Sequence, residues 1–291
     1  MLTNWRLILT SPAAGDWNMA VDEAILEAVG RDLAPPTLRL YAWQPPCLSL
    51  GYAQPITDVD LAALAISGWQ LVRRPTGGRA ILHIDELTYS VIAPHSEPRL
   101  QGSVLESYQR LAQALLKALH LLGIPAQAHE IATPPAPNPA PRDANTHTNQ
   151  SAPPATLNPI CFEVPSNYEI VVEGKKIIGS AQARRKEGVL QHGSFPLFGD
   201  ITRILQVLSF NDESSRQKAA TRLAQRATTA EIASGRFIEW EEAARAFIHA
   251  FEDTLQIRLV RSDLSAAELV RADELVREKY STLQWNHRMA L

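Results

Sequence analysis

The stretch CFEVPSNYEIVVEGKKIIGSAQARRKEGVLQHGSF, residues 161–195, sets the strand pattern around which the chain is organised. Its segments 168–172 and 175–181 are rich in β-forming residues. Glu173 and Gly174 between them predict a tight two-residue turn, because glycine tolerates a positive φ. The stretch therefore predicts an antiparallel hairpin. It also combines a cysteine, two lysines and a Gln-His-Gly-Ser run, so we treat it as the candidate active-site segment.

Further strands are predicted on both sides of this hairpin. The segments WQLVRR and RAILH flank the glycine turn PTGG, a pattern typical of strand, turn and strand. Short β-type runs with bounding turn residues are found at 37–43, 47–52, 69–74, 79–83, 87–93 and 189–197. This spacing favours a sheet whose strands are largely antiparallel.

An amphipathic helix is predicted near the start, over residues 19–29. Apolar residues recur there at helical spacing, and Asp22, Glu23 and Glu27 are expected on the opposite, polar side. Asn18 is the expected N-cap.

The strongest helical pattern is at 103–122, where Ser103 and Glu106 predict a capping box. Other helices are predicted at 58–67, 244–255 and 269–280, the last capped by Ser265 and Glu268. These patterns predict an α+β fold, a largely antiparallel or mixed sheet with packed helices and a small helical C-terminal part. We expect a catalytic domain over residues 1–200 and a helical extension over 201–291 packed on it.

Composition excludes several classes of protein. With a formal net charge of −3 over 291 residues, nothing favours nucleic-acid binding. No apolar run is long enough to span a membrane, and the N-terminus does not resemble a signal peptide, so a cytoplasmic protein is expected. Two cysteines make neither a disulfide framework nor a zinc site.

Residues 132–159 are mostly Pro, Ala, Asn and Thr and show no periodicity, which predicts a flexible insertion. Two interpretations remain open. The insertion is either a tolerated loop expansion without a role or a mobile flap over the site.

The segment RRPTGGR, residues 73–79, closes with His83 and is the first candidate binding loop. Adjacent glycines let the backbone approach a ligand closely, and arginines bind carbonyl, carboxylate or phosphate groups. The loop is neither a Walker A motif nor a dinucleotide fingerprint. A glycine pair alone is also typical of a plain hairpin turn.

Cys161 is the candidate nucleophile, because a thiol becomes reactive when a nearby cation stabilises its thiolate. A buried, inert cysteine is the alternative, and Cys47 fits that description among its apolar neighbours. Lys175 and Lys176 alternate along one strand, so only one of them can face a site. Simple alternation puts Lys176 with Ser180 but does not choose between the lysines.

The motif RRPTGGRAILH followed by ELTYSVI resembles the superfamily of lipoate-protein ligase A and biotin-protein ligases. The stretch from Cys161 is similar to one branch, the LipM-type octanoyltransferases of lipoate assembly. The likeness extends from WRLI and WNMAVDEAIL near the start to EKYSTLQWNHR near the end.

This resemblance implies the ligase catalytic-domain fold and an activity. Octanoyl would pass from octanoyl-acyl carrier protein to a lysine of a lipoyl-domain protein, typically the glycine cleavage H protein, through an acyl-thioester on Cys161. Lys176 matches the family's lysine and would lower the thiol pKa and assist the second step. No metal and no cofactor is implied. The implied substrate-binding residues are Arg73, Arg74, Gly77, Gly78, Arg79, His83, Gly179, Ser180 and His192.

The resemblance leaves two rival enzymes. An ATP-dependent lipoate-protein ligase needs no catalytic cysteine and usually has a small residue where this chain has Arg79. An amidotransferase that moves octanoyl from the H protein to other lipoyl domains also uses a cysteine. From another class, an inactive member that only binds lipoyl domains would not need both Cys161 and Lys176.

Overall fold

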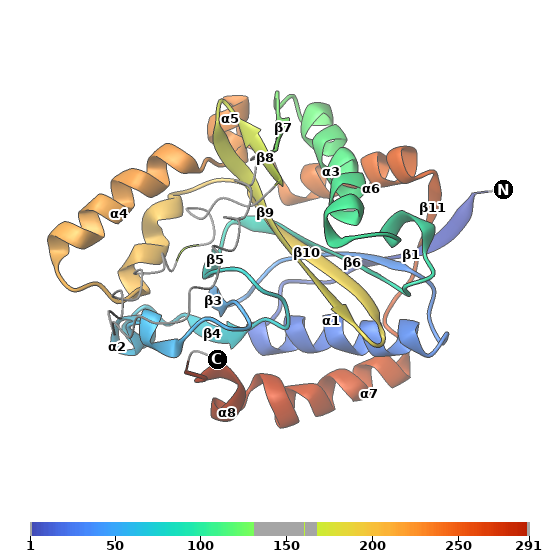
Figure 1. Ribbon diagram of the computed structural model, residues 1–291, viewed down its shortest axis with the longest axis horizontal. Helices are drawn as coiled ribbons and strands as arrows, with labels where there is room; N and C mark the ends of the chain where they lie inside the picture. Colours follow the sequence, from blue (N-terminus) through green and yellow to red (C-terminus); the bar gives the residue numbers. More distant parts are fainter. Residues whose placement is uncertain (1, 131–159, 161–167, 290–291) are drawn as a thin grey trace, which may run out of the picture.

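The computed structural model describes residues 2–130, 160 and 168–289. Cys161 and the predicted insertion at 132–159 lie outside the described residues. A large mixed sheet runs through the centre in the order β11-β1-β2-β6-β10-β9-β8-β7 (Figure 1). Its strands are β1 (Thr3–Leu9), β2 (Thr37–Tyr41), β6 (Glu86–Ala93), β7 (Gln127–Glu130), β8 (Tyr168–Val172), β9 (Lys175–Arg185), β10 (Gly188–Pro196) and β11 (Ile257–Arg261).

Pairing within this sheet is parallel only where β1 contacts β2 and β11. The remaining pairs are antiparallel, so the expectation of an α+β fold with a mixed sheet is confirmed. A second, three-stranded sheet has the order β4-β3-β5. Its strands are β3 (Cys47–Leu50), β4 (Gln70–Arg73) and β5 (Ile81–His83).

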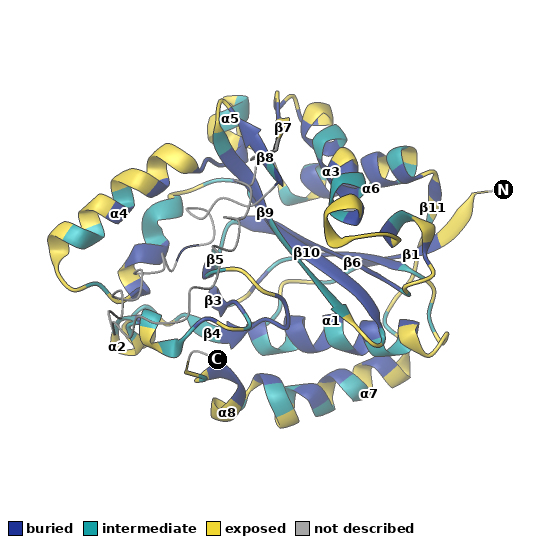
Figure 2. Cartoon of the chain, in the orientation of Figure 1, coloured by how far each residue is buried: buried dark blue, intermediate teal, exposed yellow. Residues whose placement is uncertain are grey.

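Helices cover both faces of the large sheet (Figure 1). On one face, α3 (Val104–Leu121) and α6 (Trp240–Leu255) share an apolar core with β1, β2, β6 and β10. On the other face lies α1 (Gly15–Gly30), with α7 (Ala266–Leu275) packed outside it. Figure 2 shows that β6 and β10 are buried while the outer side of α7 is exposed. The central strands are therefore covered on both sides.

The remaining helices lie around the three-stranded sheet and near the ends of the large one. They are η1 (Ile56–Asp58), α2 (Leu61–Ile66), η2 (Pro98–Leu100), η3 (Ile201–Val207), α4 (Glu213–Arg226), α5 (Ala230–Ser234), η4 (Val276–Tyr280) and α8 (Leu283–Asn286).

Several local predictions are confirmed. Glu173 and Gly174 have φ values of 50° and 76° and join β8 to β9 as a tight hairpin. The capping boxes at Ser103 and Ser265 are both formed. The prediction that Asn18 caps the first helix is wrong, because α1 begins at Gly15 and Asn18 lies within its first turns.

The C-terminal part contains a strand that the sequence did not predict. β11 pairs in parallel with β1, although most of the described chain after residue 200 is helical. Phe247 and Phe251 of α6 also belong to the same core as strands from the first half of the chain. The helical part is thus built into the main sheet and core, and the boundary at residue 200 stays a prediction.

Candidate functional site

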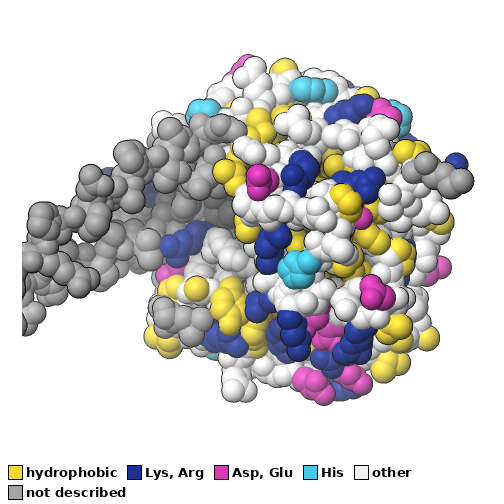
Figure 3. All heavy atoms as spheres, turned by 45° about the vertical axis from the view of Figure 1, so that its right-hand side comes forward, with side chains coloured by type: hydrophobic (Ala, Val, Ile, Leu, Met, Phe, Trp, Pro, Cys, Tyr) yellow, Lys and Arg dark blue, Asp and Glu magenta, His cyan; other side chains and the backbone are white. Residues whose placement is uncertain are grey.

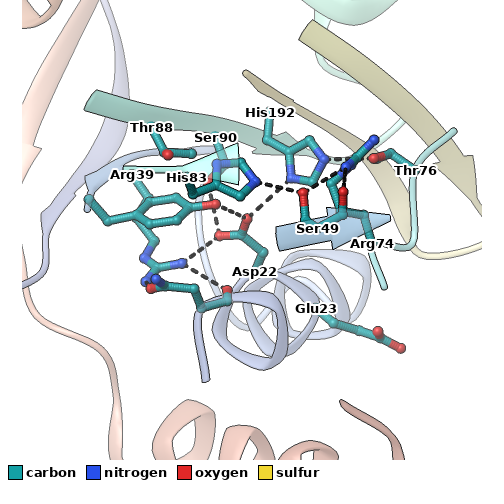
Figure 4. A network of polar contacts seen from close by, with 12 residues as sticks. Asp22, Glu23, Arg39, Ser49, Arg74, Thr76, His83, Thr88, Ser90 and His192 are labelled. Atoms are coloured by element: carbon teal, nitrogen blue, oxygen red, sulfur yellow. Dashed lines mark hydrogen bonds and ion pairs between the residues drawn. The ribbon is translucent and has the colours of Figure 1, made fainter. Parts of the chain in front are cut away.

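A buried polar network lies between α1 and the strands β2, β6 and β10 (Figure 4). At its centre Asp22 accepts hydrogen bonds from Arg39 Nη1 at 2.8 Å, Tyr41 OH at 3.0 Å and Ser90 Oγ at 3.0 Å. Burial by itself raises the pKa of Asp22, but Arg39 and His192 outweigh it and lower the pKa below the ordinary value. Asp22 is therefore an ionised carboxylate in the interior. The expectation that Asp22 lies on the polar side of the helix, opposite the apolar residues, is wrong, because it is fully buried.

Neighbouring Glu23 shows the opposite arrangement. Its side chain points away from the network in Figure 4 and binds Lys279 Nζ at 2.6 Å. The two adjacent acids of α1 therefore have different partners. Asp22 is hydrogen-bonded to side chains of β2 and β6, whereas Glu23 binds η4 on the outside of α1.

His192 connects this network to the candidate binding loop. Its Nδ1 lies 3.7 Å from Asp22 Oδ2, and its Nε2 lies 2.6 Å from Thr76 Oγ1. Because a carboxylate only accepts, Nδ1 is the protonated nitrogen and the Thr76 hydroxyl donates to Nε2. Burial lowers the pKa of His192 despite the opposing effect of Asp22, which keeps the imidazole neutral at pH 7.

A second chain of hydrogen bonds passes through His83. Its Nδ1 lies 2.8 Å from Glu86 Oε1, and its Nε2 lies 2.6 Å from Ser49 Oγ. The ring also stacks on Trp43, with centroids 3.9 Å apart. Arg74 Nη1 donates to Ser49 Oγ at 2.7 Å, which leaves the serine proton for His83 Nε2. The relay thus runs from Glu86 through His83 and Ser49 to Arg74.

Arg74 carries this relay into the glycine loop. Its Nη2 donates to the carbonyl oxygens of Gly77 at 3.1 Å and Arg79 at 2.9 Å. The loop is also seated closely on β3, because a Cβ added at Gly51 would lie 1.9 Å from the carbonyl oxygen of Gly78. Gly77 and Gly78 themselves remain exposed. The loop therefore has a fixed base and an accessible tip.

A small cavity of about 20 Å³ lies where the two hydrogen-bond chains meet. This is roughly the space that one water molecule needs, so the wall residues lie close together. The exposed atoms of its wall are almost all apolar. The lining residues that carry this argument are Met19, Trp43, Arg74, Ile81, His83 and His192. The wall is therefore apolar, with fixed polar groups at its edge.

The structure brings together five of the residues proposed from the sequence. They border the cavity and are Arg74, His83, Gly179, Ser180 and His192. The hydroxyl of Ser180, however, lies 2.7 Å from Tyr89 OH, on the α3 and α6 side of the sheet. Gly77, Gly78 and Arg79 belong to the loop that Arg74 holds, and their contact with a substrate stays a prediction.

Arg73 is not brought to the cavity. Its buried guanidinium donates to the carbonyl oxygens of Gly51 at 2.8 Å, Trp285 at 3.0 Å and Asn286 at 2.9 Å. Burial lowers its pKa to about 10, with Arg288 and Arg74 adding to the effect, so it stays charged at pH 7. The expectation that Arg73 lines an acyl pocket is corrected, because carbonyl groups occupy its donors.

A β-bulge follows the two lysines of β9. Lys176 pairs with Val171 while Ile178 pairs with Ile170, so Ile177 is an extra residue without a counterpart. Because paired residues share a face, Lys176 and Ile178 lie on opposite faces of the sheet. The expectation that Lys176 shares a face with Ile178 and Ser180 is therefore wrong.

The bulge puts Lys176 on the same face as Gly179 and His192, the face of the polar network. Its Nζ lies 3.1 Å from Glu169 Oε1 on β8, and the side chain is 6% exposed. Lys175 pairs with Val172, whose side chain belongs to the α3 and α6 core, and is half-buried. Lys176 is thus the lysine on the site face, for a reason that simple alternation missed.

Cys47 is fully buried, and burial raises the pKa of its thiol, with Asp16 and Glu86 adding to the effect. The prediction that Cys47 is a buried core residue is confirmed. Within residues 2–130, 160 and 168–289, no cluster of three metal-ligating side chains is found. No helix in that described part is long and apolar enough to cross a membrane.

Sequence reasoning missed four members of the site: Asp22, Ser49, Thr76 and Glu86. A signal for Asp22 was available in the segment TLRLY, where Arg39 interrupts an apolar strand. A buried arginine requires an anionic partner, and an acid on the adjoining helix was the available choice. Ser49, Thr76 and Glu86 gave no comparable signal, because their roles depend on contacts between distant strands.

The chain is similar in sequence and in structure to known proteins. The family described as the lipoyl protein ligase A/B catalytic domain matches residues 15–252. A protein named octanoyltransferase LipM from Brevibacillus brevis is 39% identical over 288 residues, which cover 99% of this chain and 100% of that protein. The bipartite lipoate protein ligase of Thermoplasma acidophilum, solved in a study of that ligase and its E2 lipoyl domain, has a TM-score of 0.76 at 26% identity. That match covers 98% of this chain and 96% of the ligase. A lipoate-protein ligase A bound with ATP has a TM-score of 0.75 at 25% identity, covering 99% of both chains.

Proposed function

The chain belongs to the lipoyl protein ligase A/B catalytic domain family, and on that premise we propose that it is an octanoyltransferase. It takes octanoyl from octanoyl-acyl carrier protein and delivers it to a lysine of a lipoyl-domain protein, with the glycine cleavage H protein as the proposed acceptor. Cys161 holds the acyl group between the two half-reactions. A cytoplasmic location, where carrier and acceptor would meet, is part of the proposal.

The observation that carries the proposal is a backbone bridge between Ala80 and Ile160. Ala80 directly follows the glycine loop, and Ile160 directly precedes Cys161 in the chain. The bridge thus ties the covalent neighbour of the proposed nucleophile to the loop beside the apolar cavity. Ile81, the next residue after Ala80, is part of the cavity wall. An octanoyl chain is apolar, as is the wall beside the loop.

The first half-reaction is a thioester exchange. The Cys161 thiolate attacks the acyl carbonyl, the bond to the carrier sulfur breaks, and the carrier leaves as its thiol after taking up a proton. One thioester replaces another, so the exchange has little thermodynamic cost. We assign Lys176 to the stabilisation of the thiolate, because it is a cation on the site face of β9, 3.1 Å from Glu169.

In the second half-reaction, the neutral amine of the acceptor lysine attacks the acyl-cysteine. The amide bond forms, the bond to Cys161 sulfur breaks, and the proton lost by the amine returns to the thiolate or to solvent. Lys176 assists this proton transfer. Cys47 takes no part in either step, since burial keeps its thiol protonated.

Mass spectrometry tests this function. Mixed with octanoyl-acyl carrier protein and no ATP, the protein gains one octanoyl group on Cys161. Cys161→Ala loses both the adduct and the transfer to the H protein, whereas the matched variant Cys47→Ala keeps both if it folds. Transfer by Cys161→Ala that depends on ATP would replace the proposal by a lipoate-protein ligase, the activity named for the two solved neighbours. Octanoyl loading from octanoyl-H protein but not from the carrier would instead favour the amidotransferase.

A further inference from the structure

Two arginines from distant parts of the chain converge on one tyrosine beside the glycine loop. Tyr52 is attached to that loop by its backbone N–H, which donates to the carbonyl oxygen of Thr76 at 2.9 Å. The guanidinium carbons of Arg185 and Arg288 each lie 5.4 Å from the centroid of its ring. Arg79, in the loop itself, is half-exposed. We call Arg79, Arg185 and Arg288 the cationic rim.

The rim is not neutralised by acidic side chains in the described part of the chain. There, no carboxylate lies within 4.0 Å of any of its three guanidinium groups, and Arg185 Nη2 donates to the carbonyl oxygen of Pro75 at 2.9 Å. The positive potential extends inward, because Arg288 contributes, after burial, to the lowered pKa of Arg73. The positive charges of Arg73 and Arg288 are therefore close to each other, although the chain has a formal net charge of −3.

Neighbouring cations are arranged differently. Lys279 lies 2.6 Å from Glu23, and Arg271 lies 2.9 Å from Glu27. Figure 3 shows basic and acidic side chains side by side along the lower edge of the face that it presents. Most basic residues around α1 and α7 are thus paired, and the rim is an exception next to the site.

The position of the rim suits an approaching donor. Arg185 of the rim borders an open groove of about 380 Å³, together with Pro75 and Lys186. Acidic residues at this groove are Glu23, Glu27 and Glu187, and each has a cationic partner in Lys279, Arg271 or Lys186. The groove therefore borders the glycine loop through Pro75. Arg185 is the charge at the groove that has no acidic partner in the described part of the chain.

We propose that Arg79, Arg185 and Arg288 form the docking surface for a negatively charged acyl donor, an acidic carrier protein whose acyl arm is joined through a phosphodiester. Guanidinium groups recognise both carboxylates and phosphates, and unpaired ones next to a site raise the rate of encounter with an anionic partner. The inference rests on the proposed function, because it assumes that the donor is a carrier protein. It adds where that donor binds.

Single-turnover acylation of Cys161 tests the rim. The variant Arg185→Ala/Arg288→Ala is compared with wild type and with Arg258→Ala, an exposed arginine on β11. Donors are octanoyl-carrier protein, octanoyl-4′-phosphopantetheine and the uncharged octanoyl-N-acetylcysteamine. We expect the double variant to lose roughly tenfold or more in second-order rate with the carrier, the lower end of what electrostatic steering contributes. The uncharged donor should react equally with all three proteins.

The phosphopantetheine donor identifies which charge is recognised. A loss as large as with the carrier assigns the rim to the phosphate of the acyl arm, and a smaller loss assigns it also to acidic side chains of the carrier. Both outcomes support the proposal. Wild-type rates with the carrier should also fall as salt rises, while rates with the uncharged donor stay level, which tests the rim without any substitution.

Three outcomes overturn the inference. If the double variant is acylated by the carrier as fast as wild type, the rim has no part in donor binding, although the proposed function stands. If only the later transfer to the H protein slows, the rim binds the acceptor instead. If wild type is not acylated by the carrier at all, the proposed function and the inference fail together. Thermal unfolding of the variant, measured alongside, separates loss of docking from loss of fold.

Discussion

The two faces of the central sheet differ in character, although the same strands build both. On β6, Tyr89 faces α6, where the rings of Phe247 and Phe251 lie 6.2 Å from its own. Its neighbour Ser90 faces α1 and donates to Asp22. Both faces are buried, so the polar face is not polar because it contacts solvent. One face is stabilised by apolar contact, whereas the other depends on every polar group having a partner.

This difference has a consequence for how each face tolerates change. An apolar face loses stability in proportion to the atoms removed, because its interactions are many and individually weak. A buried ionic network loses far more when one member is removed, because the remaining charge stays in the interior without compensation. The polar face is thus the more fragile one, and it is the face that holds the cavity.

The largest expected effect comes from removing the centre of the polar network. Asp22→Ala leaves the fully buried Arg39 without its carboxylate and should lower the free energy of unfolding by about 3–5 kcal/mol. The matched change on the apolar face, Phe251→Leu, should cost less than about 1.5 kcal/mol. Urea denaturation of both variants measures the contrast. Equal losses would show that the two faces do not differ in the way described.

The next effect concerns the two lysines that precede the β-bulge. Lys176→Ala should slow acylation of Cys161, because the thiolate loses the cation that stabilises it. It should also slow transfer to the acceptor by about 100-fold or more, the usual contribution of a group that assists proton transfer. Lys175→Ala, on the other face, should change the rate little. Rapid-quench mass spectrometry with octanoyl-carrier protein gives both rates. Similar effects of the two substitutions would contradict the role assigned to the site face.

The smallest expected effect is a change in how the free energy of unfolding depends on pH. Burial lowers the pKa of His192 in the folded protein, so the unfolded chain binds its proton more readily. Stability from the neutral imidazole is therefore complete above the unfolded pKa, about 6.5, and is lost as pH falls through the lower folded value. His192→Gln should flatten the fall in unfolding free energy between pH 7 and 5. The change is limited to about 1.4 kcal/mol per pH unit for one proton. An unchanged slope in chemical denaturation would mean that His192 does not titrate with unfolding.

Local chemistry made much of the fold predictable. The hairpin at Glu173 and Gly174 and the capping boxes at Ser103 and Ser265 depend on residues next to one another in the chain, so the sequence alone revealed them. β1, β7 and β11 were missed, since they depend on pairing with distant strands and have no strong alternation of their own.

The site was predictable in its parts but not in its arrangement. Arg74, His83 and His192, proposed from the sequence as substrate-binding residues, lie around one cavity, and their contact with a substrate stays a prediction. Arg73 was grouped with them because it is adjacent in sequence, yet adjacent residues on a strand point to opposite sides. The single extra residue of the bulge reversed the faces assigned to the lysines, and no composition or periodicity announces such an insertion.

Arg73 also has a consequence for the order in which the protein is completed during synthesis. It precedes the glycine loop directly, but several of its carbonyl partners lie at Trp285 and Asn286, separated from it by 212 and 213 positions. A nascent chain that has left the ribosome only as far as residue 280 has no acceptor from that segment. The base of the loop then holds a buried guanidinium that is only partly satisfied. We therefore expect the loop to settle only after residue 286 has been made, and a premature stop upstream of it to leave the loop without these anchors.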